Sequence, residues 1–249
     1  LALFPVTPQE DKSLGAEAIA SDLNLPLVFF DMSKLLSKFV GESERNIDQA
    51  IKLIEQIAPC VLLIDEVEKV LGGYKSSNAS DSGTLARVFG KVLNLLADND
   101  KGIFTVMTSN NVKDLPPELT RAGRLDAIFY FGYGDAEERY EIFKLHFEKR
   151  GQKVSDKVLK QIAKETNKYT GAEIEQIVIS AIKKAYVRMK KNKNKTYKIT
   201  EEDLKAAKTD VIPISVSSKE TIAELEDWAK NRATYANKSD KATKIEDVD

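Results

Sequence analysis

Short apolar runs alternate with longer segments of helical periodicity from the start of the chain to about residue 150. The apolar runs predict five strands, at residues 1–6, 25–32, 60–66, 102–110 and 127–133. The segments between and after them predict helices, at residues 13–23, 43–57, 82–97 and 135–150. Because the strands are too uniformly apolar for a sheet with one wet face, we expect a buried parallel sheet. The repeated strand–helix order indicates a doubly wound α/β fold with right-handed crossovers.

Strand signals stop after residue 151, where the pattern predicts helices at 155–168, 170–191 and 200–208. Capping boxes are expected at the starts of three helices, formed by Asp135/Glu138, Thr170/Glu173 and Thr200/Asp203. A further short helix is predicted to begin near Ser217, and the polar residues beyond it predict disorder. We therefore expect an α/β domain at 1–150, a helical domain with a C-terminal helix at 151–232, and a disordered tail at 233–249.

Composition narrows the chemistry that this chain can perform. A single cysteine, Cys60, and a single histidine, His146, exclude a disulfide framework and argue against a Cys/His metal site or a Ser-His-Asp triad. The 38 basic and 39 acidic residues give a formal charge of −1, which argues against wholesale nucleic-acid binding. The apolar stretch at 57–64 is too short to span a membrane. The chain starts at Leu1 with no signal-peptide pattern, and we expect that an earlier part of the protein precedes it.

Two adjacent carboxylates, Asp65 and Glu66, end the apolar strand at 60–66. In α/β proteins the carboxyl edge of the sheet is where ligands bind. One carboxylate can hold Mg²⁺ through water and the other can polarise an attacking water, as nucleotide hydrolysis requires. The alternative is a strand that simply leaves the core into an acidic loop. The residues alone leave these two interpretations open.

Further along, polar and basic residues favour the functional interpretation. Asn110 follows another predicted strand and is expected at the same edge of the sheet, within reach of a water or a phosphate. Arg121 and Arg124 flank a glycine, and from a subunit surface they could reach the phosphate of a neighbouring subunit. Each arginine could instead be a solvated surface charge or part of a local salt bridge.

This arrangement resembles the AAA family of P-loop ATPases over residues 1–210. The segment Ile64-Asp65-Glu66 matches the Walker B motif, Asn110 the sensor-1 position, and Arg121 with Arg124 the arginine-finger segment. The family's first pore loop and lid helix are matched by Phe39-Val40-Gly41 and by Gly171-Ala172-Glu173. Other segments resemble the uncharacterised AAA proteins of cyanobacteria and algal chloroplasts, namely those at 59–61, 81–84, 115–118 and 212–229.

The resemblance implies ATP and Mg²⁺ as cofactors and assigns a role to each matched residue. Lys12 would contact the β- and γ-phosphates, and Ser13 with Asp65 would hold Mg²⁺, Asp65 through water. Glu66 would orient the attacking water and Asn110 would align it, while the two arginines would act on the neighbouring subunit of a homo-oligomeric ring. Gly171 and Ala172 would face the nucleotide. Phe39 and Val40 would contact a protein substrate. The implied location is the cytoplasm or the plastid stroma.

One segment departs from the family pattern. A P-loop needs G-x-x-x-x-G-K-[ST], because its glycines let the backbone N–H groups surround the phosphates. Here the corresponding residues are 6–13, in which Lys12 and Ser13 are in register but Val6 and Asp11 replace the two glycines. Glu10 and Asp11 place negative charge where a triphosphate would lie. Two hypotheses stay open: an ATPase that remodels a protein partner, and a pseudo-ATPase that serves as an interaction module.

A basic stretch in the helical domain raises a third hypothesis, that the protein is a nucleic-acid remodelling factor. Residues 183–198 carry eight lysines and arginines and no acid. Such a stretch can contact nucleic acid or an acidic partner, or it can be a solvated helix end that suits the helix dipole. Only two tyrosines interleave it, which argues against nucleic acid as the partner. Cys60 is expected to be a buried small hydrophobe, and His146 is expected to be structural.

Overall fold

The computed structural model describes residues 2–5, 11–31, 40–68, 82–97, 101–112, 115, 119, 125–193 and 196–237. The chain forms two compact units. Of the described residues, the sheet unit comprises those up to 131 together with 228–234, and the helical unit comprises 132–227 and 235–237.

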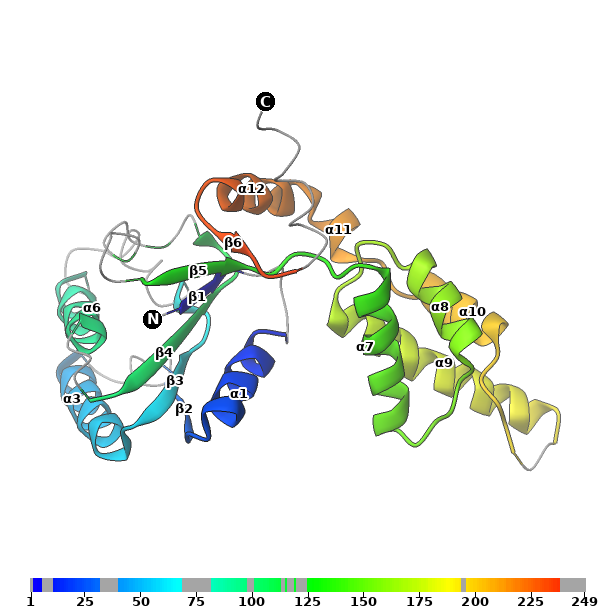
Figure 1. Cartoon of the computed structure of the whole chain (residues 1–249), viewed down its shortest axis with the longest axis horizontal. Helices are drawn as coiled ribbons and strands as arrows, with labels where there is room; N and C mark the ends of the chain where they lie inside the picture. Colours follow the sequence, from blue (N-terminus) through cyan, green and yellow to red (C-terminus); the bar gives the residue numbers. More distant parts are fainter. Residues whose placement is uncertain are drawn as a thin grey trace. The chain divides into compact units, whose positions relative to one another are not determined.

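A six-stranded sheet with the order β2-β3-β4-β1-β5-β6 is the centre of the sheet unit (Figure 1). Its strands are β1 (Ala2–Pro5), β2 (Leu27–Phe29), β3 (Cys60–Ile64), β4 (Ile103–Ser109), β5 (Ala127–Tyr130) and β6 (Thr234–Tyr235). The pairings among β1 to β5 are parallel, and all five residues of β3 are buried. Because β1 lies between β4 and β5, the chain winds outward in both directions, which confirms the doubly wound α/β fold.

Helices cover both faces of this sheet. On one face, Ala16 and Ala20 of α1 (Asp11–Leu23) pack against Val61 and Leu63 of β3. Leu62 of β3 alternates with these two residues and so faces the other side. Two helices lie on that side, α3 (Val40–Ile57) and α6 (Ser82–Ala97) (Figure 1).

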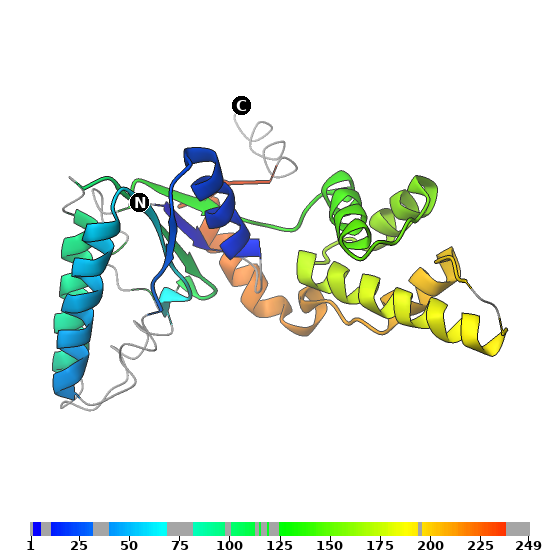
Figure 2. The same cartoon turned by 90° about the horizontal axis from the view of Figure 1, so that it is seen from below.

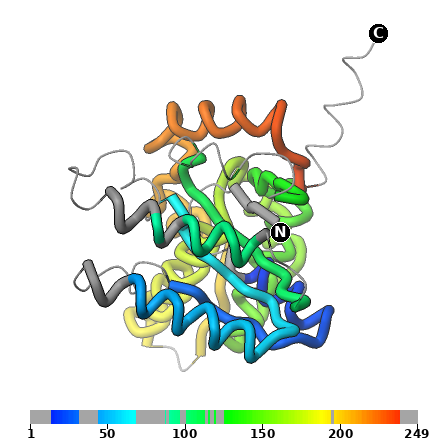
Figure 3. The backbone as a smooth tube through the Cα atoms, turned by 90° about the vertical axis from the view of Figure 1, so that its left-hand side faces the viewer, coloured from blue at the N-terminus to red at the C-terminus, as the bar shows by residue number. Residues whose placement is uncertain are grey.

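The two helices α3 and α6 lie side by side in Figure 3. Ion pairs join their exposed surfaces, with 2.6 Å between Arg87 Nε and Glu44 Oε1 and 2.6 Å between Lys91 Nζ and Asp48 Oδ1. Such exposed pairs contribute little to stability, so the buried apolar positions of the helices hold this layer in place.

The helical unit is built around α9 (Gly171–Lys191), the long yellow helix of Figure 2. The other helices are α7 (Ala136–Lys149), α8 (Asp156–Glu165), α10 (Glu201–Thr209), α11 (Ile214–Ser217) and α12 (Lys219–Lys230), of which α12 runs from this unit into the sheet unit. α7 and α10 pack against α9, and the core includes Phe143, Phe147 and Ile177, each at most 1% exposed. The three capping boxes predicted from the sequence are all present.

The structure differs from the sequence-based expectation in two places. The chain divides after residue 131 and not after residue 150, because α7 packs against α8 and α9 of the helical unit. Residues 234–235, which were expected in a disordered tail, form the edge strand β6 next to β5. A strand of two residues is too short to show an alternating pattern. The rest of the predicted tail, from residue 238, lies outside the described residues.

Two smaller expectations concern Cys60 and the membrane. Cys60 is fully buried in β3, and burial raises the pKa of its thiol, in agreement with the small hydrophobe that was predicted. Within the part of the chain that the structure describes, no helix has the length and apolar character needed to cross a lipid bilayer.

A buried carboxylate, Asp203, joins two helices of the helical unit. Its oxygens accept hydrogen bonds from Arg188 of α9 at 3.2 and 2.7 Å, and from the backbone and hydroxyl of Thr200 at 3.0 and 3.1 Å. Burial disfavours the charge on Asp203, but these hydrogen bonds outweigh burial and hold its pKa below the usual value. A carboxylate whose pKa is lowered on folding stabilises the folded state above its unfolded pKa.

We predict that Asp203→Asn lowers the free energy of unfolding by about 2 kcal/mol near neutral pH, because a charged hydrogen-bond partner is lost. The difference from the wild type should shrink as the pH falls below about 4, where the unfolded carboxyl is protonated first and the folded one later. Urea unfolding followed by far-ultraviolet circular dichroism measures both effects. Asp22→Asn on the exposed surface of α1 is the control; an equal loss in both variants would contradict the role given to Asp203.

Candidate functional site

The carboxyl ends of three neighbouring strands, β3, β4 and β1, meet at one edge of the sheet. Ile64 of β3 pairs with Met107 of β4, and Pro5 of β1 pairs with Ser109 of β4. Asp65 and Glu66 follow β3 directly, and Asn110 follows β4. The register therefore brings the predicted carboxylates and the predicted amide to the same short stretch of sheet edge.

Thr108 connects the two carboxylate residues to β4. Its hydroxyl donates a hydrogen bond to Asp65 Oδ1 and accepts one from the backbone N–H of Glu66, at 3.0 Å. The same N–H lies 3.1 Å from Asp65 Oδ1. Thr108 is fully buried whereas Asp65 is exposed. The hydroxyl thus holds one oxygen of a carboxylate that otherwise faces solvent.

Glu66 adopts a left-handed backbone conformation with φ of 49°. For a residue with a Cβ this conformation costs about 1–2 kcal/mol, so it persists only where surrounding contacts impose it. The hydrogen bond from its N–H to Thr108 is one such contact. The turn directs the Glu66 side chain toward Asn110, whose Nδ2 donates to Glu66 Oε1 at 3.2 Å.

Glu68 holds the backbone of Asn110 through a hydrogen bond. Its Oε1 accepts a hydrogen bond from the backbone N–H of Asn110 at 2.9 Å, and the residue is only 7% exposed. Its second oxygen, Oε2, is buried without a hydrogen-bond partner in the described part of the chain. Three carboxylates therefore lie within four residues of the sequence at this edge. The negative potential that they produce favours a cation at the site.

The structure brings together only part of the predicted site. Asp65, Glu66 and Asn110 converge as expected. Lys12 and Ser13 lie in the first turn of α1, of which only the backbone is described there, and residues 6–10 join this helix to β1. Because α1 ends shortly before the parallel strand β2 starts at the opposite edge, the start of α1 lies toward the carboxyl edge of the sheet.

The other predicted residues lie elsewhere or outside the described part of the chain. Gly171 and Ala172 begin α9 in the helical unit, and their contact with nucleotide stays a prediction. Val40 is the first residue of α3, with an undescribed side chain. Phe39, Arg121 and Arg124 fall outside the described residues, so the roles expected of them also stay predictions.

Sequence reasoning missed Thr108 and Glu68. Thr108 is a polar residue within an apolar strand, two positions before Asn110, and that placement was a signal available in the sequence. Glu68 carried no comparable signal, because acids often follow the end of a strand. Its burial and its contact with Asn110 become visible only in the fold.

The acidic edge is suited to Mg²⁺ held through water. Among the described residues, no three His, Cys, Asp or Glu side chains form a group that could ligate a metal directly. Mg²⁺ differs from metals that need such a cage, because it keeps several waters and is held by one or two carboxylates together with phosphate oxygens. An exposed Asp65 carboxylate with one oxygen fixed by Thr108 meets that requirement.

Two further groups lie in the helical unit. His146 Nδ1 of α7 is 3.5 Å from Glu175 Oε1 of α9, and Arg150 also donates to Glu175, which lowers the pKa of that carboxyl. Glu173 accepts from the backbone of Thr170 at 2.7 Å and from that of Ile214 at 2.5 Å, so it ties the start of α9 to the start of α11. These contacts join helices to one another.

Comparison with known proteins identifies relatives over most of the chain. The chain is 39% identical over 219 residues to the "Uncharacterized AAA domain-containing protein ycf46" of Guillardia theta, covering 88% of this chain and 42% of that protein. It is 32% identical over 173 residues to the "Cell division cycle protein 48 homolog" of Archaeoglobus fulgidus, covering 68% of this chain and 23% of the relative. The chain thus spans less than half the length of either relative.

Structure and family comparisons agree with these relatives. The solved AAA domain of FIGL-1 superimposes with a TM-score of 0.77 at 20% identity, covering 94% of this chain and 77% of that one, which shows the shared fold. The sequence profile of the ATPase family associated with various cellular activities (AAA) matches residues 7–133. With the sheet order and the acidic edge described above, this match shows that the chain belongs to the AAA family of ATPases.

Proposed function

We propose that this chain binds and hydrolyses ATP with Mg²⁺ and that turnover drives the remodelling of a protein partner. The observation that carries the proposal is the convergence of Asp65, Glu66 and Asn110 at the carboxyl edge of neighbouring parallel strands. In AAA ATPases this edge carries the hydrolytic residues, and family membership makes nucleotide the expected ligand.

The described residues fit Mg²⁺ at one end of a nucleotide. When bound, the ion neutralises charge on the phosphate oxygens. Asp65 would hold it through water, with Ser13 as the other protein group. α1 begins at this edge, so the positive end of its dipole faces the position of an anion. Lys12, in the same first turn, would add a charge-assisted contact to the phosphates.

Glu66 is the residue proposed to orient the attacking water. Its left-handed backbone turns the carboxylate toward Asn110, and the amide of Asn110 holds one carboxylate oxygen at 3.2 Å. In this role the carboxylate would accept a proton from the water that it orients. Glu68 fixes the backbone of Asn110, and Asn110 in turn contacts Glu66. Glu68 would therefore be a positioning residue that does not touch the attacking water.

The wider assembly belongs to the same proposal. Arg121 and Arg124 would contact the nucleotide of a neighbouring subunit, which requires a homo-oligomer, and Phe39 with Val40 would contact the remodelled protein. Gly171 and Ala172 would face the nucleotide from the lid. These assignments rest on the resemblance to AAA proteins, as does a location in the cytoplasm or the plastid stroma.

A second candidate function is a pseudo-ATPase that serves as an interaction module. The observation that favours it is the sequence of residues 6–13, in which Val6 and Asp11 replace the two glycines of the phosphate loop. A β-branched residue resists positive φ, and an aspartate repels a phosphate at ~4 Å by about 1 kcal/mol in water. The two candidates share the fold and differ in whether nucleotide binds and is hydrolysed.

We predict that the chain binds Mg²⁺·ATP in a calorimetric titration, and that Glu66→Gln lowers the rate of phosphate release about 100-fold. The affinity for ATP should change little, because the glutamine still accepts a hydrogen bond from Asn110. Glu55→Gln on α3 is the matched control and should release phosphate at the wild-type rate. Unchanged phosphate release by Glu66→Gln would show that another base acts, and absence of binding at millimolar ATP would establish the pseudo-ATPase.

Repair of the phosphate loop gives a separate prediction. Val6→Gly combined with Asp11→Gly should tighten ATP binding about tenfold, since one negative charge is removed and the backbone gains access to positive φ. The same titration measures the change. Glu17→Ala removes one exposed charge from α1 without altering the loop, and equal tightening in both variants would mean that the loop does not limit binding.

The Thr108 hydroxyl gives a third prediction. Thr108→Val should lower the free energy of unfolding of the sheet unit by about 1–3 kcal/mol, because the N–H of Glu66 and Oδ1 of Asp65 lose a partner. Thr108→Ser should restore most of that loss. Urea unfolding followed by the fluorescence of Trp228, the chain's single tryptophan, reports on this unit. Equal losses in the two variants would contradict a role for the hydroxyl.

A further inference from the structure

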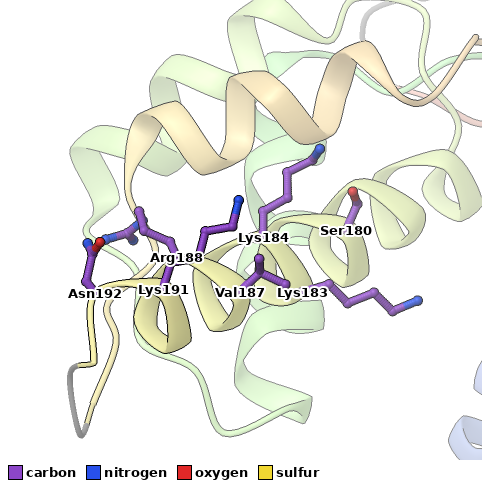
Figure 4. A pocket seen from close by; sticks show the side chains of 7 residues that line it. All are labelled: Ser180, Lys183, Lys184, Val187, Arg188, Lys191 and Asn192. Atoms are coloured by element: carbon purple, nitrogen blue, oxygen red, sulfur yellow. The ribbon is translucent and has the colours of Figure 1, made fainter.

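A shallow groove follows one side of α9 from Ser180 to Asn192 and has a volume of about 540 Å³ (Figure 4). Its remaining lining residues are Lys183, Lys184, Val187, Arg188 and Lys191, so four of its seven side chains are cationic and none is acidic. The opposite side of α9 is buried in the core of the helical unit. We call this surface the α9 groove.

Two of the four cations already have partners within the helical unit. Lys184 Nζ lies 2.9 Å from Asp210 Oδ2, and Arg188 donates to Asp203 and to the carbonyl of Lys198 at 2.7 Å each. These contacts fix one wall of the groove and compensate the charge of that wall. They do not supply an anion to the other two lysines.

Lys183 and Lys191 are both exposed, and within the described residues no carboxylate pairs with either of them. Val187 lies between them along the helix and is 51% exposed. The three residues are four positions apart, so they form one stripe with steps of about 6 Å along the helix axis. The groove therefore presents a cation, an aliphatic side chain and a cation at nearly equal spacing.

An extended peptide has a matching repeat. Its side chains on one face recur every two residues, which is roughly 6.6 Å. We propose that the α9 groove binds an extended segment of a partner protein in which an apolar residue stands between two acids, each two residues away. The two carboxylates then meet Lys183 and Lys191, and the apolar side chain covers Val187. None of its lining residues is among those proposed to bind nucleotide, and its role holds whether or not ATP is hydrolysed.

The same geometry disfavours a nucleic acid. A phosphodiester backbone carries a charge at every step, so a strand that reached both lysines would set a phosphate against Val187, where desolvation is unfavourable. Single-stranded nucleic acid also needs aromatic faces for its bases. Tyr186 does not line the groove; it contacts Tyr197 edge to face, with 6.2 Å between the ring centroids, and Lys190 lies over its ring.

Fluorescence polarisation with the full chain tests the proposal. The probe is a short fluorescein-labelled peptide with one leucine between two glutamates, each separated from it by a glycine. Lys183→Glu combined with Lys191→Glu should weaken binding about tenfold, which is 1.4 kcal/mol. Lys157→Glu combined with Lys164→Glu, at exposed positions of α8, makes the same change in net charge and should leave binding within about twofold. Circular dichroism checks that both variants are folded.

Three results would overturn the proposal. Equal weakening in both double variants would show that net charge alone attracts the peptide. Equal affinity for a peptide of the same composition with its two glutamates adjacent would contradict the spacing argument. Tighter binding of an oligouridine with the same number of charges would assign the groove to nucleic acid.

A further variant, Val187→Asp, tests the apolar position between the two lysines. Loss of binding to the spaced peptide in this variant, with the α8 variant unaffected, would support the proposed peptide site, because a carboxylate there repels both acids.

Discussion

The parallel pairing of β3 with β4 brings Asp65, Glu66 and Asn110 together at one edge of the sheet. Because Ile64 stands beside Met107, the two strands end together and Asp65 meets the hydroxyl of Thr108. A slip of one residue would exchange the side chains of β3 between the two covered faces and would separate Asp65 from the hydroxyl of Thr108. The packing of β3 against helices on both faces therefore favours this register. The arrangement of the acidic edge is a direct result of how the core packs.

Most of the fold could be predicted from the sequence because its strands and helices have clearly different residue patterns. A strand such as β3 is apolar throughout, and capping boxes such as Thr170 with Glu173 mark where helices begin. The boundary between the two units was harder, since α7 follows the sheet in the chain but packs against α9. The tertiary contacts of a helix decide to which unit it belongs, and these contacts cannot be predicted from the helix sequence alone.

The same distinction applies to the site and to the α9 groove. Asp65, Glu66 and Asn110 could be predicted because each follows directly after an apolar strand. Glu68 could not, because its function depends on the distance between two loops. In α9 the basic stretch was evident from the sequence, but only the fold shows that Asp203 and Asp210 neutralise part of it. What the sequence cannot provide is the pairing between distant segments.

The strand β6 makes the sheet unit depend on residues that follow the helical unit in the chain. The sheet unit is interrupted by residues 132–227 and is completed by residues 228–234. During synthesis on the ribosome, β5 has no strand on its outer side until residues 132–227 and then β6 have been synthesised. An uncovered edge strand offers unpaired N–H and C=O groups to other chains. Rapid folding of the helices, which contact near neighbours in sequence, shortens the period during which a nascent chain carries this risk of aggregation.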